Sequence, residues 1–363
     1  MDDNTDSKFL KGIFFILLIF VTVLSGFLFK TMADFFKPVV LAVLLSLVFY
    51  PLIKRLNVII KLPWWLSTLI VYLAFFVAFF LVVNILTTSF KSIVEAIPRY
   101  QERFASIQEA LKSFISSHPD SRIFALFNFD RDVSLFANLN NQFDILNFLK
   151  NIAVNFTSSV VGFMKTLFLV ILLSVFLLAE FKKTKHKVRL AFTNEHNLRV
   201  IKIVRNIISD TTHYISIKFV ISLITGALVF AMCAILKIDF PLIWGFLSFC
   251  LNFIPTFGSI ASCVITTVFS VIQFYPSLAA PVIITVWMIA VNMILGNVIE
   301  PKIEGTNLGI SPFIILVSLS LSGWIWGILG MILAVPLMVI IKIICENISY
   351  LKPVAVFIGD KGK

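Results

Sequence analysis

Two long stretches without a charged residue fill most of the C-terminal third of the chain. They cover residues 240–299 and 305–341, and only the short cluster Glu300-Pro301-Lys302-Ile303-Glu304 separates them. Glycine, proline and asparagine interrupt both stretches. A bilayer interior penalises ionisable and helix-breaking residues unless protein or water surrounds them. Broken apolar helices beside a small polar cluster are typical of a solute path, so the pattern predicts a polytopic transporter.

The composition excludes a soluble domain. Hydrophobic residues make up 59% of the chain and charged residues 13%, whereas soluble domains carry about 25% charged residues. The net charge of +11 does not indicate nucleic-acid binding, because the basic residues gather in short segments beside apolar spans. All four cysteines lie in apolar segments without metal-ligand spacing, so we expect neither disulfides nor a metal site. They are Cys233, Cys250, Cys263 and Cys345.

The predicted fold is an all-α, polytopic membrane protein with about eight apolar segments. A segment of about twenty apolar residues crosses the hydrocarbon core. The first five predicted spans are residues 12–29, 38–53, 62–90, 152–181 and 214–236. The first is longer than the apolar core of a signal peptide, so we expect a retained membrane helix.

Loop charge predicts the direction of insertion. Lys54, Arg55 and Lys61 follow the second span, and residues 182–210 are strongly basic, whereas residues 91–150 balance acids and bases. Because basic loops stay inside, we expect both termini in the cytoplasm. The predicted segments are N-terminal membrane helices at 1–90, an extracytoplasmic helical segment at 91–150, a membrane helix at 151–181, a basic cytoplasmic segment at 182–213, a transport core at 214–345 and a cytoplasmic tail at 346–363.

The outer segment carries apolar side chains at spacings of three and four, which predicts a helix that packs against another helix. These residues are Ile97, Tyr100, Phe104, Ile107, Leu111 and Phe114. Two interpretations stay open. The helix contributes an oligomer contact or a solute vestibule, or it belongs to a hairpin that covers its own membrane domain.

Two of the apolar segments are expected to be broken or re-entrant helical hairpins. After Pro241 an apolar piece of about a dozen residues ends near Asn252, and a second piece runs to Phe274. Each half is expected to be too short to cross the bilayer, so a hairpin with its tip inside the protein fits better. A full span at 276–299 follows and ends at Glu300.

The second broken segment begins at Pro312 and is expected to be interrupted at Gly327, Gly330 and Pro336. Trp244-Gly245 followed by Pro255 is echoed by Trp326-Gly327 followed by Pro336. If both segments are hairpins, they would enter from opposite sides, as in the inverted repeats of many secondary transporters.

The polar residues of the transport core are the candidate site. Glu300, at the end of an apolar span with Asn297 one turn earlier, would bind a cation or exchange a proton; alternatively it pairs locally with Lys302. Asn252, Thr256 and Asn292 would contact a solute or a sodium ion, or form hydrogen bonds between helices. The predicted solute or ion path is Asn252, Pro255, Thr256, Gly258, Asn292, Asn297, Glu300, Pro301 and Lys302, and the predicted structural hinges are Gly305, Gly309, Pro312, Gly327, Gly330 and Pro336.

Enzymatic chemistry is not expected. The sequence contains neither a phosphate-binding Gly-x-x-x-x-Gly-Lys-Ser/Thr loop nor a His-Glu-x-x-His motif, and its four histidines are dispersed. We therefore expect no catalytic residues and no cofactor.

Three ordered motifs resemble one membrane-protein family. Residues 252–258 are similar to its Asn-x-Ile-Pro-x-x-Gly element, and residues 300–312 to its Glu-Pro-x-x-x-Gly and Leu-Gly-x-x-Pro elements. Residues 327–336 are similar to its Gly-x-x-Gly-x-x-x-Ala-x-Pro signature. Together with the apolar segments and the basic central loop, these motifs resemble the autoinducer-2 exporter-like family, the PerM-type permeases.

The resemblance implies a secondary transporter of the bacterial inner membrane that forms homo-oligomers, pentamers in the family, with an elevator-like moving domain. Members include exporters of autoinducer-2 and sodium(lithium)/proton antiporters. The expected function is export of a small polar organic solute by alternating access. Two alternatives stay open: a sodium(lithium)/proton antiporter, and a non-transporting membrane scaffold. The expected partners are the lipid bilayer and a small polar solute or a monovalent cation or proton.

Overall fold

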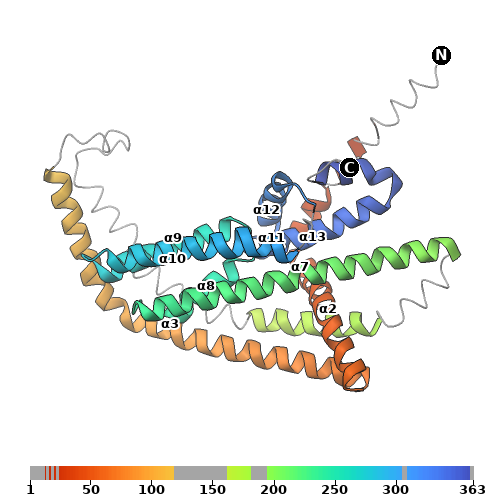
Figure 1. Ribbon diagram of the computed structural model, residues 1–363, viewed down its shortest axis with the longest axis horizontal. Coiled ribbons are helices and arrows are strands. Elements are labelled where there is room, and N and C mark those ends of the chain that lie inside the picture. Colours follow the sequence, from red (N-terminus) through yellow and green to blue (C-terminus); the bar gives the residue numbers. More distant parts are fainter. Residues whose placement is uncertain are drawn as a thin grey trace, which may run out of the picture. The chain divides into compact units, whose positions relative to one another are not determined.

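The described part of the protein is almost entirely helical. The computed structural model describes residues 24–117, 162–180, 194–304 and 309–359, with isolated positions between 13 and 21 (Figure 1). Within these ranges the only β-type pairing is an isolated bridge between Ile310 and Gly359. The all-α prediction is confirmed. Part of the predicted first span lies outside the described residues.

Seven described helices are long and apolar enough to cross a membrane, which confirms the polytopic prediction. They are Ala33–Ile59, Trp64–Ile93, Gly162–Glu180, Ile201–Ile235, Phe257–Phe274, Ala279–Ile303 and Ile328–Asn347. The shorter apolar helices Pro241–Leu251 and Pro312–Trp326 complete the set.

The chain forms two compact units. Unit 1 comprises residues 1–72, 166–217 and 304–363, and unit 2 comprises residues 73–165 and 218–303. The helices α3 (Trp64–Ser117) and α7 (Asn194–Ile235) each contribute to both units. The division into functional segments made from the sequence stays a prediction.

A cluster of buried hydroxyl groups joins three helices of unit 1. Ser46 lies on α2 (Ala33–Ile59), Ser174 on the helix Gly162–Glu180, and Tyr72 on α3. The Ser46 and Ser174 hydroxyls are 2.6 Å apart, and the Tyr72 hydroxyl also bonds Ser174. Because lipid offers no alternative partners, such bonds between helices fix their register. The predicted short second span was wrong in length, since α2 continues through Pro38 and Pro51 to Ile59.

The second broken segment is a hairpin within unit 1. Helix α12 (Pro312–Trp326) and helix α13 (Ile328–Asn347) meet at Gly327, whose φ of 66° lies in the region that glycine adopts without strain. A 3₁₀ turn η2 (Ser349–Leu351) and α14 (Lys352–Ile358) then return the chain to the start of α12, where the Ser311 amide donates to the Ile358 carbonyl.

The expected interruptions of this hairpin at Gly330 and Pro336 were wrong, because α13 runs through both. Gly330 is needed for packing: a Cβ there would lie 1.9 Å from the Ser322 carbonyl oxygen of α12. Pro336 is buried within α13, and membrane helices tolerate proline where neighbouring protein surrounds it.

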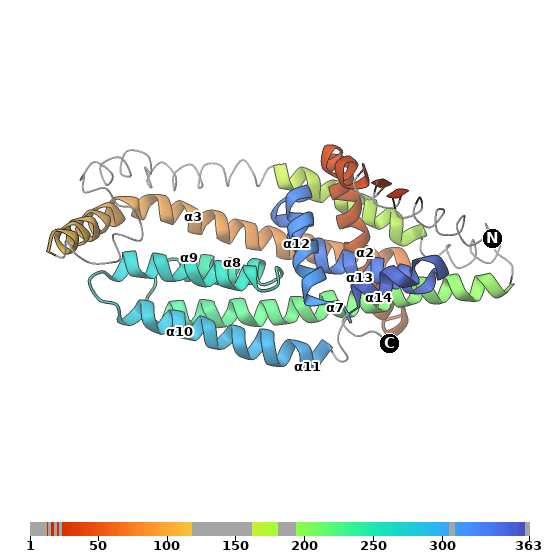
Figure 2. The same ribbon diagram turned by 90° about the horizontal axis from the view of Figure 1, so that it is seen from above.

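Unit 2 contains the first hairpin and the following span. Helices α8 (Pro241–Leu251), α9 (Phe257–Phe274) and α10 (Ala279–Ile294) run alongside the C-terminal half of α7 (Figures 1 and 2). Trp244 of α8 packs on Phe269 of α9 with ring centroids 4.7 Å apart. Ile284 and Met288 of α10 complete this core, and both are fully buried.

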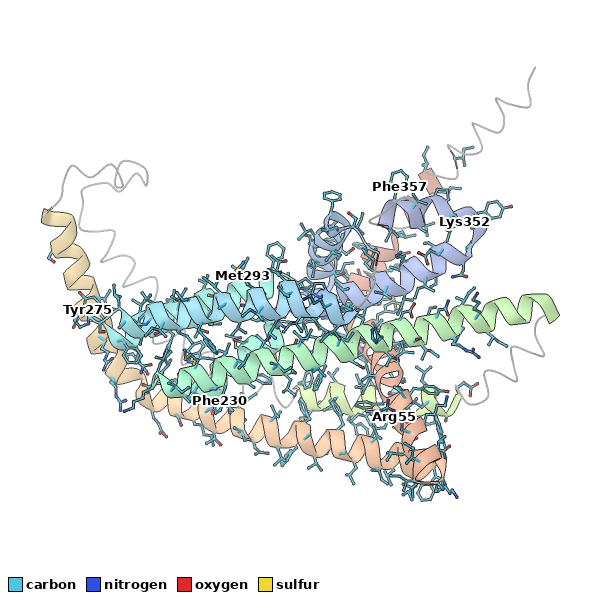
Figure 3. All side chains as sticks on the ribbon, viewed as in Figure 1. Arg55, Phe230, Tyr275, Met293, Lys352 and Phe357 are labelled. Atoms are coloured by element: carbon cyan, nitrogen blue, oxygen red, sulfur yellow. The ribbon has the colours of Figure 1, made fainter. Side chains whose placement is uncertain are left out.

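Apolar side chains also cover the outer faces of these helices. Met293 of α10 is 59% exposed and Phe230 of α7 is 40% exposed (Figure 3). Tyr275 marks the turn between α9 and α10. An apolar exterior around a partly polar interior is the arrangement expected of a protein that has lipid as its solvent.

Both ends of the first hairpin lie at one turn of the chain. The Trp244 indole near the start of α8 donates to the Asp239 carbonyl at 2.9 Å. Gln273 at the end of α9 bonds the Asp239 amide and the Lys237 carbonyl, each at 2.8 Å. The expected hairpin is therefore present. The expectation that both halves are short was wrong, because α9 has 18 residues against 11 for α8.

The two Trp-Gly pairs that resemble each other in the sequence occupy different positions in the two hairpins. Trp244-Gly245 lies inside the first helix of its hairpin, whereas Trp326-Gly327 lies at the break. The structural correspondence is different. Gly258 meets the Leu251 carbonyl just as Gly330 meets the Ser322 carbonyl, so in each hairpin a glycine after the break packs against the preceding helix.

The predicted outer helix exists as the continuation of the third span. Helix α3 runs without a break from Trp64 to Ser117 and therefore includes the whole predicted seam. Among the seam side chains that the structure describes, Tyr100 is buried and Ile107 is half-buried. Residues 118–150 of the predicted outer segment lie outside the described residues.

Candidate functional site

A buried ion pair joins α7 to the end of the α10 span. The Lys218 Nζ atom lies 2.6 Å from Glu300 Oε1, and the two side chains are 6% and 14% exposed. Burying both charges costs several kcal/mol each, which close pairing repays only with good geometry. Charged groups inside a membrane segment are therefore rare and usually mark a solute or ion path.

The alternative that Glu300 pairs locally with Lys302 needs correction. Lys302, the predicted local partner of Glu300, is exposed, and the partner is Lys218, which lies 82 residues away in the chain. Lys218 itself is buried.

A π-helical turn directs Glu300 toward its partner. After α10 the chain forms the π-turn η1 (Leu295–Ile299) and then the short helix α11 (Glu300–Glu304). The Glu300 amide donates to the Leu295 carbonyl, five residues earlier. A π-turn contains one residue more than an α-turn and is often found at functional sites. The extra residue rotates everything that follows, including the Glu300 carboxylate.

The tip of the first hairpin meets α7 one turn away from the ion pair. Asn252, which ends α8, is 7% exposed and donates from Nδ2 to Ser222 Oγ at 3.0 Å. Ser222 and Lys218 are four residues apart on α7 and share one helix face. The hairpin tip and the ion pair therefore contact the same face of α7, which we call the polar face (Lys218, Ser222, Thr225).

The remaining hairpin-tip residues are placed differently from one another. Thr256 is exposed and has a φ of 64°, which is an outlier for a β-branched residue. Pro255 precedes it in the loop between α8 and α9. Gly258 is buried, and a Cβ there would lie 1.7 Å from the Leu251 carbonyl oxygen. Among the predicted tip residues, Asn252 forms the hydrogen bond to the polar face.

The other predicted site residues do not join this cluster within the described part of the chain. Asn292 is half-buried on α10, Asn297 is exposed in η1, and Pro301 is exposed on α11. Gly305 lies outside the described residues. Gly309 has a φ of 60°, and Pro312 occupies the first turn of α12, where its missing amide costs little.

A second polar cluster lies at the base of the first hairpin, outside the membrane spans. The Tyr100 hydroxyl donates to Asp239 Oδ2 at 2.5 Å, and Arg99 Nη1 lies 3.9 Å from the same oxygen. Burial raises the pKa of Tyr100 well above its ordinary value of 10.0, and Asp239 raises it further. The phenol therefore stays a hydrogen-bond donor through the physiological range. It ties α3 to the turn that holds both ends of the hairpin.

Substituting Tyr100 by phenylalanine should lower the free energy of unfolding by about 1–2 kcal/mol, since one bond to a carboxylate is lost. The folded-state pKa is raised above the unfolded value, so this stabilisation is complete below pH 10 and is lost as the pH rises further. The difference between the unfolding midpoints of wild type and variant should therefore be constant between neutral pH and pH 9 and should shrink at higher pH. Denaturation in detergent would measure both midpoints. Tyr350→Phe, at an 86% exposed site, should leave the midpoint unchanged. A gap that persists undiminished above pH 10 would contradict the assignment.

Comparison with known proteins matches nearly the whole chain to one family. The family model described as AI-2E family transporter matches residues 14–350. The chain belongs to the AI-2E family of transporters. A protein of Borreliella burgdorferi that is named as a transport protein is 32% identical over 349 residues, covering 96% of this chain and 91% of the relative. The AI-2 transport protein TqsA of Escherichia coli is 27% identical over 345 residues, covering 94% of each chain.

Membership of the AI-2E family confirms the resemblance drawn from the three motifs. The chain is a multi-pass membrane protein of a transporter family, and its relatives are named for transport rather than for catalysis. The family match and the helices together fit a bilayer environment and a small solute.

Sequence reasoning missed Lys218, Ser222 and Asp239 as parts of these clusters. One signal was available for the first two: Lys218, Ser222 and Thr225 recur at helical spacing inside an otherwise apolar helix. Asp239 carried no comparable signal, because its partner Tyr100 lies 139 residues away.

Proposed function

We propose that this AI-2E family member exports a small polar organic solute by alternating access, with the Lys218–Glu300 pair as the charged part of its solute site. The pair carries the proposal, because it is buried among membrane helices and lies one turn from the Asn252 tip. Re-entrant hairpins and broken helices form the solute sites of many secondary transporters.

The charge balance of the pair favours a neutral polar solute over a bare cation. The ammonium group of Lys218 already neutralises Glu300, so a sodium ion at the carboxylate would have to displace it. A polyhydroxylated solute can instead donate to the carboxylate and accept from the ammonium group and from Asn252. The E. coli relative is named as an AI-2 transport protein, so small polyhydroxylated solutes are the first class to test.

The test uses purified protein in proteoliposomes loaded with a labelled polyhydroxylated solute, starting with autoinducer-2. We expect efflux that exceeds that of empty liposomes, saturates with solute concentration and is lost in Glu300→Gln. Glu346→Gln is the matched control, because it alters a half-exposed i,i+4 pair with Lys342. Folded wild-type protein that releases none of the tested solutes faster than empty liposomes would contradict the proposal.

A sodium(lithium)/proton antiporter is the second candidate, favoured by the carboxylate of Glu300 at the end of a membrane span. Here an imposed pH gradient should dissipate when sodium or lithium is added, as an internal pH dye would report, and Glu300→Gln should abolish the response. Dissipation without solute efflux would select this candidate over export. We also propose a location in the bacterial inner membrane with both termini inside, and a homo-oligomer.

A further inference from the structure

Buried polar side chains form a column through unit 2, in which hydrogen bonds and helical spacing relate one member to the next. It begins at the Lys218–Glu300 pair and ends at Asp239 at the base of the first hairpin. Its members are Ser222, Asn252, Ser248, Ser262, Thr266 and Ser270, each at most 7% exposed. Unit 2 is otherwise built from apolar helices, so this column is a distinct feature of its interior.

The first half of the column is connected by hydrogen bonds between helices. Asn252 donates to Ser222 Oγ at 3.0 Å. One turn back on α8, the Ser248 hydroxyl bonds Ser262 of α9 at 3.3 Å. The polar face of α7 is thereby joined, through the hairpin tip, to α9.

The second half follows one face of α9. Ser262, Thr266 and Ser270 are spaced four residues apart, which places their side chains in one row along the helix. Gln273 continues the row and bonds the amide of Asp239 at 2.8 Å. Asp239 is about one-third exposed and meets the phenol of Tyr100, so the column ends at a polar, accessible group.

Two hydroxyls in this row have no hydrogen-bond partner among the described residues. They are Thr266 Oγ1 and Ser270 Oγ, and both residues are completely buried. Thr225 and Thr285, on neighbouring helices, each bond the carbonyl four residues earlier. An unsatisfied buried hydroxyl costs about 1–3 kcal/mol, and ordered water is the usual way in which proteins avoid that cost.

The column is long enough to cross most of a bilayer. From Lys218 to the end of α7 at Ile235, a rise of 1.5 Å per residue gives about 25 Å, against about 30 Å for the hydrocarbon core. The column therefore extends from the Lys218–Glu300 pair to the Asp239 cluster at the opposite end of these helices.

The spacing of the hydroxyls selects what such a route can carry. Hard metal cations require several oxygen ligands that converge on one point, and single hydroxyls about one helical turn apart do not provide them. An organic solute requires a cavity of roughly 300 Å³ or more with converging polar groups, whereas these hydroxyls lie in a single row one helical turn apart. A proton needs only groups that both donate and accept, and hydroxyls and water do both.

We propose that this column is a hydrated proton route that supplies Glu300 from the Asp239 side. A water beside Asp239 receives a proton from bulk, and each water or hydroxyl accepts one proton while it donates another. The last water or hydroxyl gives up a proton to the Glu300 carboxylate, which forms a new O–H bond. One proton therefore enters the column at Asp239 for each proton that reaches Glu300. The proposal rests on the function proposed above, because a secondary transporter requires a coupling ion.

The test compares Thr266→Val/Ser270→Ala with wild type in proteoliposomes that contain an internal pH dye. With an inside-negative potassium diffusion potential and saturating solute, proton uptake by the variant should fall roughly tenfold or more, because two hydroxyl groups of the proposed relay are lost. Thr267→Val is the matched control: it removes a hydroxyl of the same helix that bonds Thr285 of α10 at 2.7 Å instead. Thr266→Ser, which keeps a hydroxyl, should retain uptake.

Exchange of labelled internal solute for unlabelled external solute, without a pH gradient, separates this proposal from the function on which it depends. The double variant should retain that exchange, because a carrier loaded with solute in both directions needs no proton, and this would show a folded carrier that has lost only its proton supply. Wild-type efflux without proton uptake would overturn the proton route and leave the export function intact. Uptake by the double variant equal to wild type, or an equal loss in Thr267→Val, would also overturn the route. If no water lies beside these hydroxyls, removing them should raise the stability of the double variant and leave proton uptake unchanged, which would also overturn the route.

Discussion

Replacing Lys218 by methionine is expected to destabilise the folded protein by about 3–5 kcal/mol, because it leaves the Glu300 carboxylate buried without its partner. Methionine keeps the length and apolar character of the lysine stem, so the loss would come mainly from charge rather than from packing. The measurement is the midpoint of reversible unfolding in mixed detergent. Glu300→Gln should cost a similar amount, since it leaves the ammonium group unpaired.

The double variant Lys218→Met/Glu300→Gln decides whether the two residues act as a pair. Because no uncompensated charge remains, it should be clearly more stable than either single variant. Lys302→Met is the matched control, because Lys302 is exposed, and it should change the stability by less than about 0.5 kcal/mol. Additive losses in the double variant, or a large loss in Lys302→Met, would show that Glu300 has a different partner.

Gly258→Ala and Gly330→Ala are expected to have the second largest effects. A Cβ at these positions would lie 1.7 Å from the Leu251 oxygen and 1.9 Å from the Ser322 oxygen. Both contacts are to backbone, so a helix of the hairpin would have to move. The expected loss of stability is roughly 3 kcal/mol, the upper end for overpacking, and thermal unfolding of the purified variants would measure it.

Gly296→Ala provides the control for both substitutions. Gly296 also lies in a helical segment, but a Cβ there would meet nothing within 4 Å. Its stability should change by no more than about 0.5 kcal/mol. If all three alanine variants unfold at the same temperature, close packing at the hairpin tips is not what these glycines provide.

The first hairpin could be predicted from the sequence because its signals are local. Pro241 starts an apolar piece, and the Asn252–Gly258 stretch combines a proline and a glycine between two such pieces. Proline and glycine change the conformations that are open to the backbone at their own positions, so their effect can be predicted without knowledge of distant contacts. The same reasoning identified Gly327 as the break of the second hairpin.

Helix lengths were harder to predict, because contacts with neighbouring helices can keep a helix intact through a proline or glycine that would otherwise interrupt it. Pro336 and Gly330 interrupt a helix in isolation, yet both lie within α13, where surrounding helices stabilise it. Likewise α2 passes through two prolines.

The partner of Glu300 could not be predicted because packing of α7 against the α10 span determines it. Local charge suggested Lys302, two residues away, and only the fold brings Lys218 within 2.6 Å. The π-turn before Glu300 has no sequence signature, although it decides which face the carboxylate occupies. The column on α9 was visible only as scattered serines and threonines until its buried, unpartnered hydroxyls were placed in three dimensions.

The π-turn η1 has a consequence for how this chain tolerates insertions and deletions. One extra residue in a helix rotates the following side chains by about 100°. The direction of Glu300 therefore depends on how many residues lie between Leu295 and Ile299 more than on which residues they are. We therefore expect this turn to tolerate exchange of its apolar side chains, whereas the deletion of one residue would keep every charged residue and still separate Glu300 from Lys218.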